Sequence, residues 1–185
     1  MDADTPFIPR SGPMFSRSSP AKAQMATDLA IPILADGGWS ALTLRNVAAA
    51  ANVTPQAIAA WFPSVAAMRA AVAAVYGDRW IRERGNLARA RTFSASSGGA
   101  GLTVPDVALA LLPQSWLEEV FDGIWSTIVE AGRWDDAIGS SVTAIRSRER
   151  DLTRGLLEAS RRDELESLER EVELVLTFVH GFRRG

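Results

Sequence analysis

The chain has 185 residues, of which 47% are hydrophobic, so it can fold as a small domain joined to a medium-sized one. It contains no cysteine, which excludes a disulfide framework and thiolate chemistry and permits a reducing compartment. No apolar run approaches the roughly 20 residues of a membrane span, and the N-terminus lacks the apolar core of a signal peptide. We therefore expect a soluble, cytoplasmic protein without membrane association.

The formal net charge is −2, but it is unevenly divided along the chain. Residues 1–91 carry ten Lys and Arg against six Asp and Glu, whereas residues 92–185 carry ten against sixteen. Two interpretations stay open: surface variation between two helical regions, or a basic half that faces phosphate and an acidic half that faces solvent or a partner. The asymmetry favours a nucleic-acid partner without establishing one.

The first 20 residues contain four prolines and five serines or threonines and show no hydrophobic periodicity. This composition predicts a disordered arm over residues 1–20. Arg10 and Arg17 lie in the arm and could contact a DNA backbone or minor groove, as basic arms sometimes do. With only these arginines, an inert tail is the simpler interpretation.

Residues 21–36 predict the first helix, because apolar residues recur along one side at helical spacing. The expected buried stripe consists of Met25, Leu29, Ile33 and Leu34. Pro32 lacks the amide that an interior helical position needs, so we expect this helix to be bent or shortened. Gly37 and Gly38 are typical of a helix end.

Residues 42–62 read as two short helices joined by a tight turn, which is the plan of a helix-turn-helix. Thr43 can cap the first of these helices through its hydroxyl. One apolar face follows, made of Leu44, Val47, Ala48 and Ala51. Asn52 suits the reversal of the chain because asparagine tolerates a left-handed backbone, and Val53 is expected to anchor the turn.

The second of these helices has a strong start signal. Thr54 offers a hydroxyl N-cap, and Pro55 follows at the first helical position, where no amide is required. Ile58 and Phe62 lie four residues apart and should point back onto the first helix. The outer face, where a recognition helix would meet a DNA groove, then carries Gln56, Ala57, Ala60 and Trp61.

A long fourth helix is predicted from Ser64, a plausible N-cap, to about Arg91. Its expected inner side consists of Met68, Val72, Val75 and Trp80. Five arginines crowd its far end, and a solvated charged face explains them better than a binding site: Arg79, Arg82, Arg84, Arg89 and Arg91. Residues 92–102, rich in Ser and Gly, read as a flexible loop and as the most natural boundary between the two halves.

The rest of the chain predicts helices near residues 104–112, 115–131, 135–161 and 165–183, with no strand pattern. In the second of these, one stripe is expected to be mostly core: Leu117, Phe121, Ile124, Trp125 and Ile128. The last helix repeats the pattern with Leu165, Leu168, Val172, Val175, Leu176 and Val179. The fold class predicted is all-α.

Residues 35–72 resemble the N-terminal DNA-binding domain of the tetracycline-repressor-like (TetR) regulators. The matching features are a helix that ends in Gly-Gly-aromatic, then Leu-Thr-Leu-Arg-Asn-Val-Ala, then Val-Thr and a short helix that closes on Trp-Phe-Pro-Ser, and finally a long helix. The resemblance implies a three-helix DNA-binding domain over residues 21–65 and a helical ligand-binding and dimerisation domain over residues 66–185. It also implies a ligand-responsive transcriptional regulator, with repression as the expected sign.

The resemblance further implies a homodimer whose recognition helices enter successive major grooves of a near-palindromic double-stranded operator. The positions that would contact phosphate are Thr43 and Thr54, and Arg45 is the only charged residue between Leu42 and Met68. The base-facing positions are Pro55, Gln56, Ala57 and Ala60, with Trp61 where the family usually has an aromatic residue packed on the backbone. Gln56 could read adenine, and alanine methyl groups could meet thymine methyl groups.

The sequence departs from the family pattern at three DNA-contacting positions. The family typically has a tyrosine and a histidine in the second helix and a lysine just after Phe-Pro-Ser, where this chain has Ala59, Ala60 and Val65. Each lost phosphate contact lowers affinity. An alternative is therefore a TetR-like protein with weak or no DNA binding, whose alanine face (Ala57, Ala59 and Ala60) docks a protein partner or serves a heterodimer.

The C-terminal part of the resemblance implies a pocket for a small hydrophobic effector. Phe121, Trp125, Ile128 and Trp134 are the candidate lining residues, with plain core packing as the alternative. An enzyme finds no support, since the lone histidine, His180, suits a core or interface role and no metal-ligand, cofactor or phosphate-loop pattern appears. The segment Val-Leu-Thr-Phe-Val-His-Gly-Phe resembles the start of the family's last helix, which normally continues beyond the position of Gly185. Either dimerisation uses a shorter interface or this chain is truncated relative to the family pattern.

Overall fold

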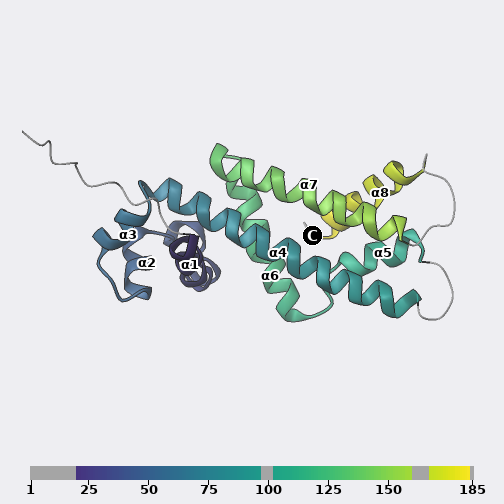
Figure 1. The fold of residues 1–185 in the computed structure, drawn as a ribbon, viewed down its shortest axis with the longest axis horizontal. Helices are drawn as coiled ribbons and strands as arrows, with labels where there is room; N and C mark the ends of the chain where they lie inside the picture. The colour runs from purple at the N-terminus through teal and green to yellow at the C-terminus, as the bar shows by residue number, and fades with distance from the viewer. Residues whose placement is uncertain (1–19, 97–101, 160–166, 184–185) are drawn as a thin grey trace, which may run out of the picture.

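The computed structural model describes residues 20–96, 102–159 and 167–183, and these residues form eight helices without any strand. The helices are α1 (Pro20–Ala41), α2 (Leu44–Ala50), α3 (Pro55–Trp61), α4 (Val65–Ser96), α5 (Val104–Leu111), α6 (Trp116–Ala131), α7 (Asp136–Glu158) and α8 (Leu168–Phe182). The all-α prediction is confirmed. Figure 1 shows a head made of α1, α2 and α3 at one end and a body made of the later helices, with α4 running from one into the other. The predicted arm, with Arg10 and Arg17, lies outside the described residues apart from Pro20.

The first helix runs through Pro32 and changes direction at Gly38. Gly38 has φ 64° and ψ −164°, a backbone conformation that is essentially restricted to glycine, so the helical run predicted to end at the glycine pair does end there. The shortening expected from Pro32 does not occur, because this proline faces solvent and the backbone around it stays helical. Met25 was expected to be buried but is exposed, since Ala26 and Ala30 take the inner positions of the helix instead.

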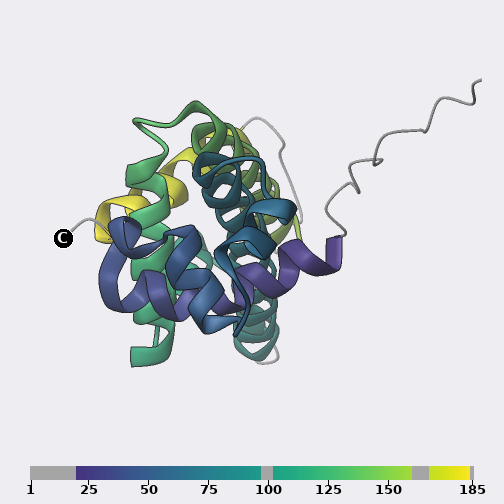
Figure 2. The ribbon, with the colours of Figure 1, turned by 90° about the vertical axis from the view of Figure 1, so that its left-hand side faces the viewer.

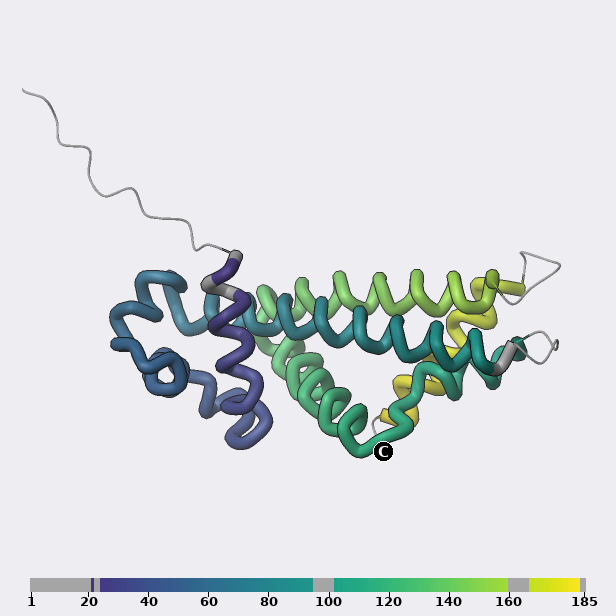
Figure 3. Tube along the Cα trace, turned by 60° about the horizontal axis from the view of Figure 1, so that its bottom comes forward, coloured from purple at the N-terminus to yellow at the C-terminus, as the bar shows by residue number. Residues whose placement is uncertain are grey.

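The long helix α4 is the spine that joins head to body. It packs against α1 in the head and against α5, α6 and α7 in the body, and Figure 3 shows α4 and α7 running side by side. The predicted loop from residue 92 begins later, because Thr92 is buried and helical and α4 continues to Ser96. Val75 was expected on the inner side and is only partly buried.

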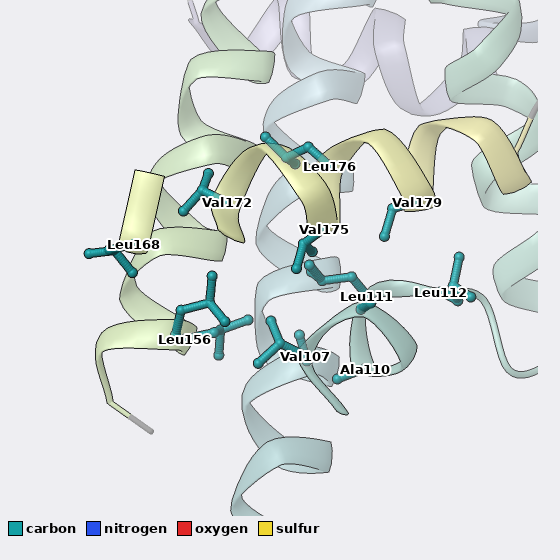
Figure 4. Close-up of a cluster of buried hydrophobic side chains, with 13 residues drawn as sticks. Val107, Ala110, Leu111, Leu112, Leu156, Leu168, Val172, Val175, Leu176 and Val179 are labelled. Atoms are coloured by element: carbon teal, nitrogen blue, oxygen red, sulfur yellow. The ribbon is translucent and has the colours of Figure 1, made fainter. Parts of the chain in front are cut away.

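The body has two hydrophobic clusters. The one next to the head centres on Trp80 and Trp125, whose rings stack with centroids 5.0 Å apart, and it includes Tyr76 and Ile128. The one at the far end joins α5, α7 and α8, and Figure 4 shows their side chains meeting there. The predicted stripe of the last helix is confirmed at Leu168, Val172, Val175, Leu176 and Val179, whereas Leu165 lies outside the described residues.

The prediction that Leu117 of α6 belongs to the core is wrong. Leu117 is 70% exposed, and Phe121 is only partly buried, because the buried side of this helix is narrow and consists of Asp122, Ile124, Trp125 and Ile128. Within the described residues, no individual helix has the length and apolar composition needed to cross a membrane, and only α3 and α4 taken together, bent by 67°, reach that threshold.

Candidate DNA-binding surface and ligand cleft

The helix-turn-helix is built by local hydrogen bonds that its sequence predicts. The hydroxyl of Thr43 accepts the backbone amide of Asn46 at 3.2 Å, and the hydroxyl of Thr54 accepts that of Ala57 at 3.2 Å, so both predicted N-caps are confirmed. Asn52 has φ 52°, the left-handed conformation expected of the turn. The side chain of Val53 does not anchor this turn, since it is exposed; its backbone amide does so by donating to the carbonyl of Ala48 at 3.0 Å.

The second helix, α3, buries one side and leaves the other free for contact. Ile58 and Phe62 are buried against α2 and α4, as predicted. Figure 2 views the molecule from the head. Among the predicted contact positions, Pro55, Gln56 and Ala60 are exposed, as are Arg45 and Thr54. Ala57, Trp61 and Thr43 are partly buried. Trp61 packs at the edge of the hydrophobic cluster of the head, so this ring does not project fully from the surface.

The head carries little charge. Residues 20–64 contain Lys22 and Arg45 against Asp28 and Asp36, which gives a formal net charge of zero. The basic excess of the N-terminal half lies mainly along α4, where Arg84 and Arg91 pair with acids of α6 in the body. The interpretation of a basic half that faces phosphate therefore does not fit the arrangement of the described residues.

Arg69, on α4, has a structural role that the sequence analysis did not identify. Its Nε donates to the carbonyl of Leu42 at 3.2 Å, and its Nη2 donates to that of Trp39 at 2.8 Å. These bonds satisfy carbonyl groups at the corner between α1 and α2. The side chain thus fixes the helix-turn-helix to α4 and is not available as a phosphate contact.

The four predicted ligand residues lie in different surroundings. Trp125 and Ile128 are buried in the core next to the head, and Trp134 is 86% exposed in the turn between α6 and α7. Phe121 lines the cleft described next, and a ligand-binding role for these four residues stays a prediction. The spacing of nine residues between the tryptophans alternates the sides of the helix, and α6 ends before Trp134.

That cleft lies between α4 and α6 and encloses about 280 Å³. We call it the α4–α6 cleft. It is lined by apolar side chains (Trp80, Leu87, Leu117 and Phe121), by three arginines (Arg79, Arg84 and Arg91) and by three acids (Glu83, Glu118 and Asp122). An apolar pocket with a few charged groups is the usual form of a small-molecule site.

A buried network of charged groups lies behind the cleft and joins four helices. Asp122 on α6 pairs with Arg84 on α4 and accepts a hydrogen bond from the indole N–H of Trp80 at 2.8 Å. Its Oδ2 lies 3.2 Å from Nε of Arg183. Arg183 also donates to Glu149 on α7 at 2.9 Å, and His180 on α8 lies 2.8 Å from the same carboxylate. The interface role expected for His180 therefore takes the form of a contact between α7 and α8.

Burial and charge act in opposite directions on this network. Burial raises the pKa of Glu149, but the hydrogen bond from His180 and the charges of Arg183 and His180 outweigh it and lower this pKa to about 2. Burial and the neighbouring Arg183 lower the pKa of Arg84, while Asp122 opposes them. The sequence does carry a signal for the network. Arg84 lies four residues after Trp80, and Glu149 lies four residues after Ile145, so each charged residue falls on an otherwise apolar side of its helix.

The outer face of α8 carries an exposed apolar stripe that the sequence analysis also did not identify. Leu174, Phe178 and Phe182 repeat every four residues and are 61%, 52% and 60% exposed. The opposite side of the same helix is the buried stripe. A helix that is apolar on two sides is typical of one that packs between the core and a partner.

No protein-family model matches the chain, and no curated protein matches its sequence. Solved structures do match its fold. A transcriptional regulator from Rhodococcus sp. Rha1 superposes with a TM-score of 0.65 at 15% identity, covering 88% of this chain and 81% of the other. A protein assigned to the TetR family, from Rhodococcus sp., gives 0.58 at 15% identity over 88% and 85% of the two chains. A transcriptional regulator from Pseudomonas aeruginosa PAO1 gives 0.52 at 19% identity over 92% and 95%. The protein therefore has the fold of the TetR-family transcriptional regulators.

Proposed function

We propose that the protein is a cytoplasmic transcriptional regulator, acting as a repressor, that binds a near-palindromic operator as a homodimer and responds to a small ligand. The observation that carries the proposal is the helix-turn-helix, whose caps and turn are formed as a recognition module requires. Its second helix leaves Pro55, Gln56 and Ala60 exposed for the major groove. Thr43 and Thr54 accept capping bonds, which leaves each hydroxyl proton available to a phosphate oxygen.

The same proposal assigns the apolar stripe of α8 to the dimer. Leu174, Phe178 and Phe182 form a continuous apolar face on the last described helix, and a second copy of this chain would cover it with its own stripe. A two-fold dimer of this kind presents two heads to one duplex, which matches the symmetry of the operator that the proposal requires.

The test is binding of the full chain to the promoter of its own gene, measured by fluorescence anisotropy at low and moderate salt. We expect an affinity well above that for random DNA of equal length. Because Arg45 is the only charged residue between Leu42 and Met68, Arg45→Gln should reduce the slope of log K against log salt by about 2 per dimer. Arg133→Gln removes an arginine of the body that is also exposed and should leave the slope unchanged. Affinity no better than for random DNA at both salt concentrations would refute DNA-binding regulation.

Sequence reading by α3 has a separate test. Gln56→Ala should weaken binding to the operator by about 1 to 3 kcal/mol per subunit and relax the preference at one base pair, as expected for loss of a paired contact to adenine. Gln114→Ala, an exposed glutamine of the body, should change neither quantity. If Gln56→Ala binds the operator as tightly as the unaltered protein, Gln56 does not read a base.

The dimer is tested by sedimentation. Phe178→Glu places a charge in the centre of the α8 stripe and should convert the dimer into monomers. Trp134→Glu introduces the same charge at a more exposed aromatic residue far along the chain and should leave the dimer intact. A Phe178→Glu protein that stays dimeric would assign the interface to another face.

One observation favours a second candidate function. The head has a formal net charge of zero, and Ala59 and Ala60 expose only methyl groups on α3. Such a surface suits packing against a protein partner, or a heterodimer subunit that does not itself bind DNA, better than binding to phosphate. DNA binding that is absent even at low salt, together with a stoichiometric partner lost on Ala60→Glu, would support this candidate over the first.

A further inference from the structure

We propose that the α4–α6 cleft binds a small organic acid, whose aromatic or short acyl body lies on the apolar wall and whose carboxylate accepts hydrogen bonds from the arginines of the cleft. The inference rests on the proposed function, since this acid would be the effector that changes the affinity for operator DNA.

The apolar wall of the cleft is accessible from solvent. Leu117 is 70% exposed and Leu87 38% exposed at its rim, while Trp80 is buried and Phe121 is partly buried. A volume of about 280 Å³ accommodates an aromatic or short acyl group and is at the lower end of small-molecule sites. Covering Leu117 and Phe121 would remove apolar surface from water, which favours a ligand with an apolar body.

The charged part of the cleft holds a hydrogen-bond donor that lacks an acceptor. The side chain of Arg84 is only 7% exposed, it lines the cleft, and its Nε has no hydrogen-bond partner among the described residues. Buried polar groups are nearly always paired, so an unpaired guanidinium N–H of a residue that lines a ligand-sized cleft is informative, although this nitrogen is itself closed off from solvent. A guanidinium can only donate, and therefore the missing partner is an acceptor.

The other charges of the cleft also favour an anion. Asp122 is approached by both Arg84 and Arg183, and the two oxygens of Glu118 both accept from Nη2 of Arg91, at 2.7 and 2.8 Å. Both of these carboxylates are thus opposed by arginines, although Oδ2 of Asp122, which lies 3.2 Å from Nε of Arg183, accepts no hydrogen bond from the described residues. Among the described residues Arg79 forms one long ion pair, 4.0 Å to Asp28, and its guanidinium lies 5.8 Å above the ring of Phe121. Glu83, the remaining acid, lies 4.0 Å from Arg82.

The buried network gives the cleft a physical connection to the proposed dimer face. A carboxylate bound by Arg84 would compete with Asp122 for that guanidinium. Asp122 also faces Arg183, which with His180 holds Glu149 of α7. His180 lies on α8, and Arg183 directly follows that helix, so a change in the network would move the helix that carries Phe178.

The experiment uses three naphthalene probes that share one body and differ in head group: naphthoate, naphthylmethanol and naphthylmethylamine. Binding to the full chain is measured by titration calorimetry without DNA. We expect naphthoate to bind at least about tenfold more tightly than the alcohol, and the amine to bind most weakly. Arg79→Gln should reduce the preference for naphthoate over the alcohol, whereas Leu117→Ala should weaken both probes alike; both side chains are exposed enough to be replaced without unfolding the protein.

Two control variants make the assignment specific. Arg82→Gln removes a neighbouring exposed arginine outside the cleft, and Trp134→Ala removes an exposed aromatic residue; neither should change the binding of naphthoate. No binding of naphthoate up to about 1 mM, equal affinity for the three probes, a preference for the amine, or loss of binding on Trp134→Ala would each overturn the proposal.

The effector role is tested by adding saturating naphthoate to the operator titration. We expect the operator affinity to change at least fivefold, about 1 kcal/mol, and unchanged affinity would overturn the effector role. The two proposals fail separately. If naphthoate binds as expected but the protein does not bind the operator, the cleft assignment holds and the regulatory function is refuted. If the protein binds the operator but not naphthoate, the regulatory function holds and the cleft assignment is refuted.

Discussion

The head and the body of this protein are stabilised by different kinds of interaction. The core of the head is apolar, and the polar bonds within its helix-turn-helix join residues close in sequence, such as Thr54 with Ala57, while Arg69 ties it to α4. The body buries tryptophans together with charged groups far apart in the chain, such as Arg84 with Asp122. Caps and close packing suffice to shape a small recognition module. A buried ionic network is costly to desolvate. In return its charged side chains pair in one defined arrangement, which a bound ligand can change by competing for one of them.

The largest difference between the two regions should appear when the network loses its central carboxylate. Asp122→Ala leaves the guanidinium groups of Arg84 and Arg183 facing each other without their shared acid, and removing one partner of a buried pair costs about 3 to 5 kcal/mol. We expect a loss of that size in the free energy of unfolding, measured by urea denaturation followed by tryptophan fluorescence.

The matched control for this change is Asp151→Ala. Asp151 pairs with Arg154 on the surface of α7 and its side chain is 64% exposed, so its loss should cost less than about 1 kcal/mol. If the two alanine variants lose similar stability, the buried network contributes no more than a surface ion pair, and the contrast between head and body is wrong.

Acid should destabilise the body through Glu149. The pKa of this carboxyl is about 2 in the folded protein against an ordinary value of 4.5. Its contribution to the free energy of unfolding is therefore fully present above pH 4.5 and is lost as the pH falls through 2. The loss amounts to about 3 kcal/mol. Urea midpoints measured at several pH values should fall over this interval. Glu149→Gln should be less stable at neutral pH and should show a smaller fall; an equal fall would assign the acid sensitivity to other carboxylates.

Local signals predicted the head well, and the features that depend on tertiary packing were not predicted. Thr43, Asn52 and the Thr54–Pro55 pair each act on their own backbone, so spacing alone places them. The α4–α6 cleft depends on which sides of two distant helices meet, and periodicity placed Leu117 in the core when it forms the rim. The solvated face expected for the arginines of α4 is wrong at Arg84, which is only 7% exposed, because the partners in its network are distributed over four helices and cannot be read from spacing.

Close packing between α4 and α7 gives the next prediction. A Cβ at Gly77 would lie 2.7 Å from Cγ1 of Ile145 and 3.0 Å from Trp125, so Gly77→Ala must push these helices apart. We expect a loss of about 1 to 2 kcal/mol on urea unfolding, after allowing for the better helix propensity of alanine. Gly123→Ala has no atom within 4 Å of the added Cβ and should gain about 0.5 to 1 kcal/mol. Equal effects of the two substitutions would contradict the close approach of α4 to α7.

The smallest effect is expected in the head, at the cap of α3. Thr54→Ala removes the acceptor of the Ala57 amide, which costs about 1 kcal/mol, and Thr54→Ser should restore it. Because the head is held by local bonds, we expect this loss to act locally: amide hydrogen exchange in α3 should quicken about fivefold, while exchange in α7 stays unchanged. Exchange that quickens equally in both helices would mean that head and body open together through α4. The head would then share its stability with the body, and its helix-turn-helix could not reorganise on DNA without disturbing the buried network.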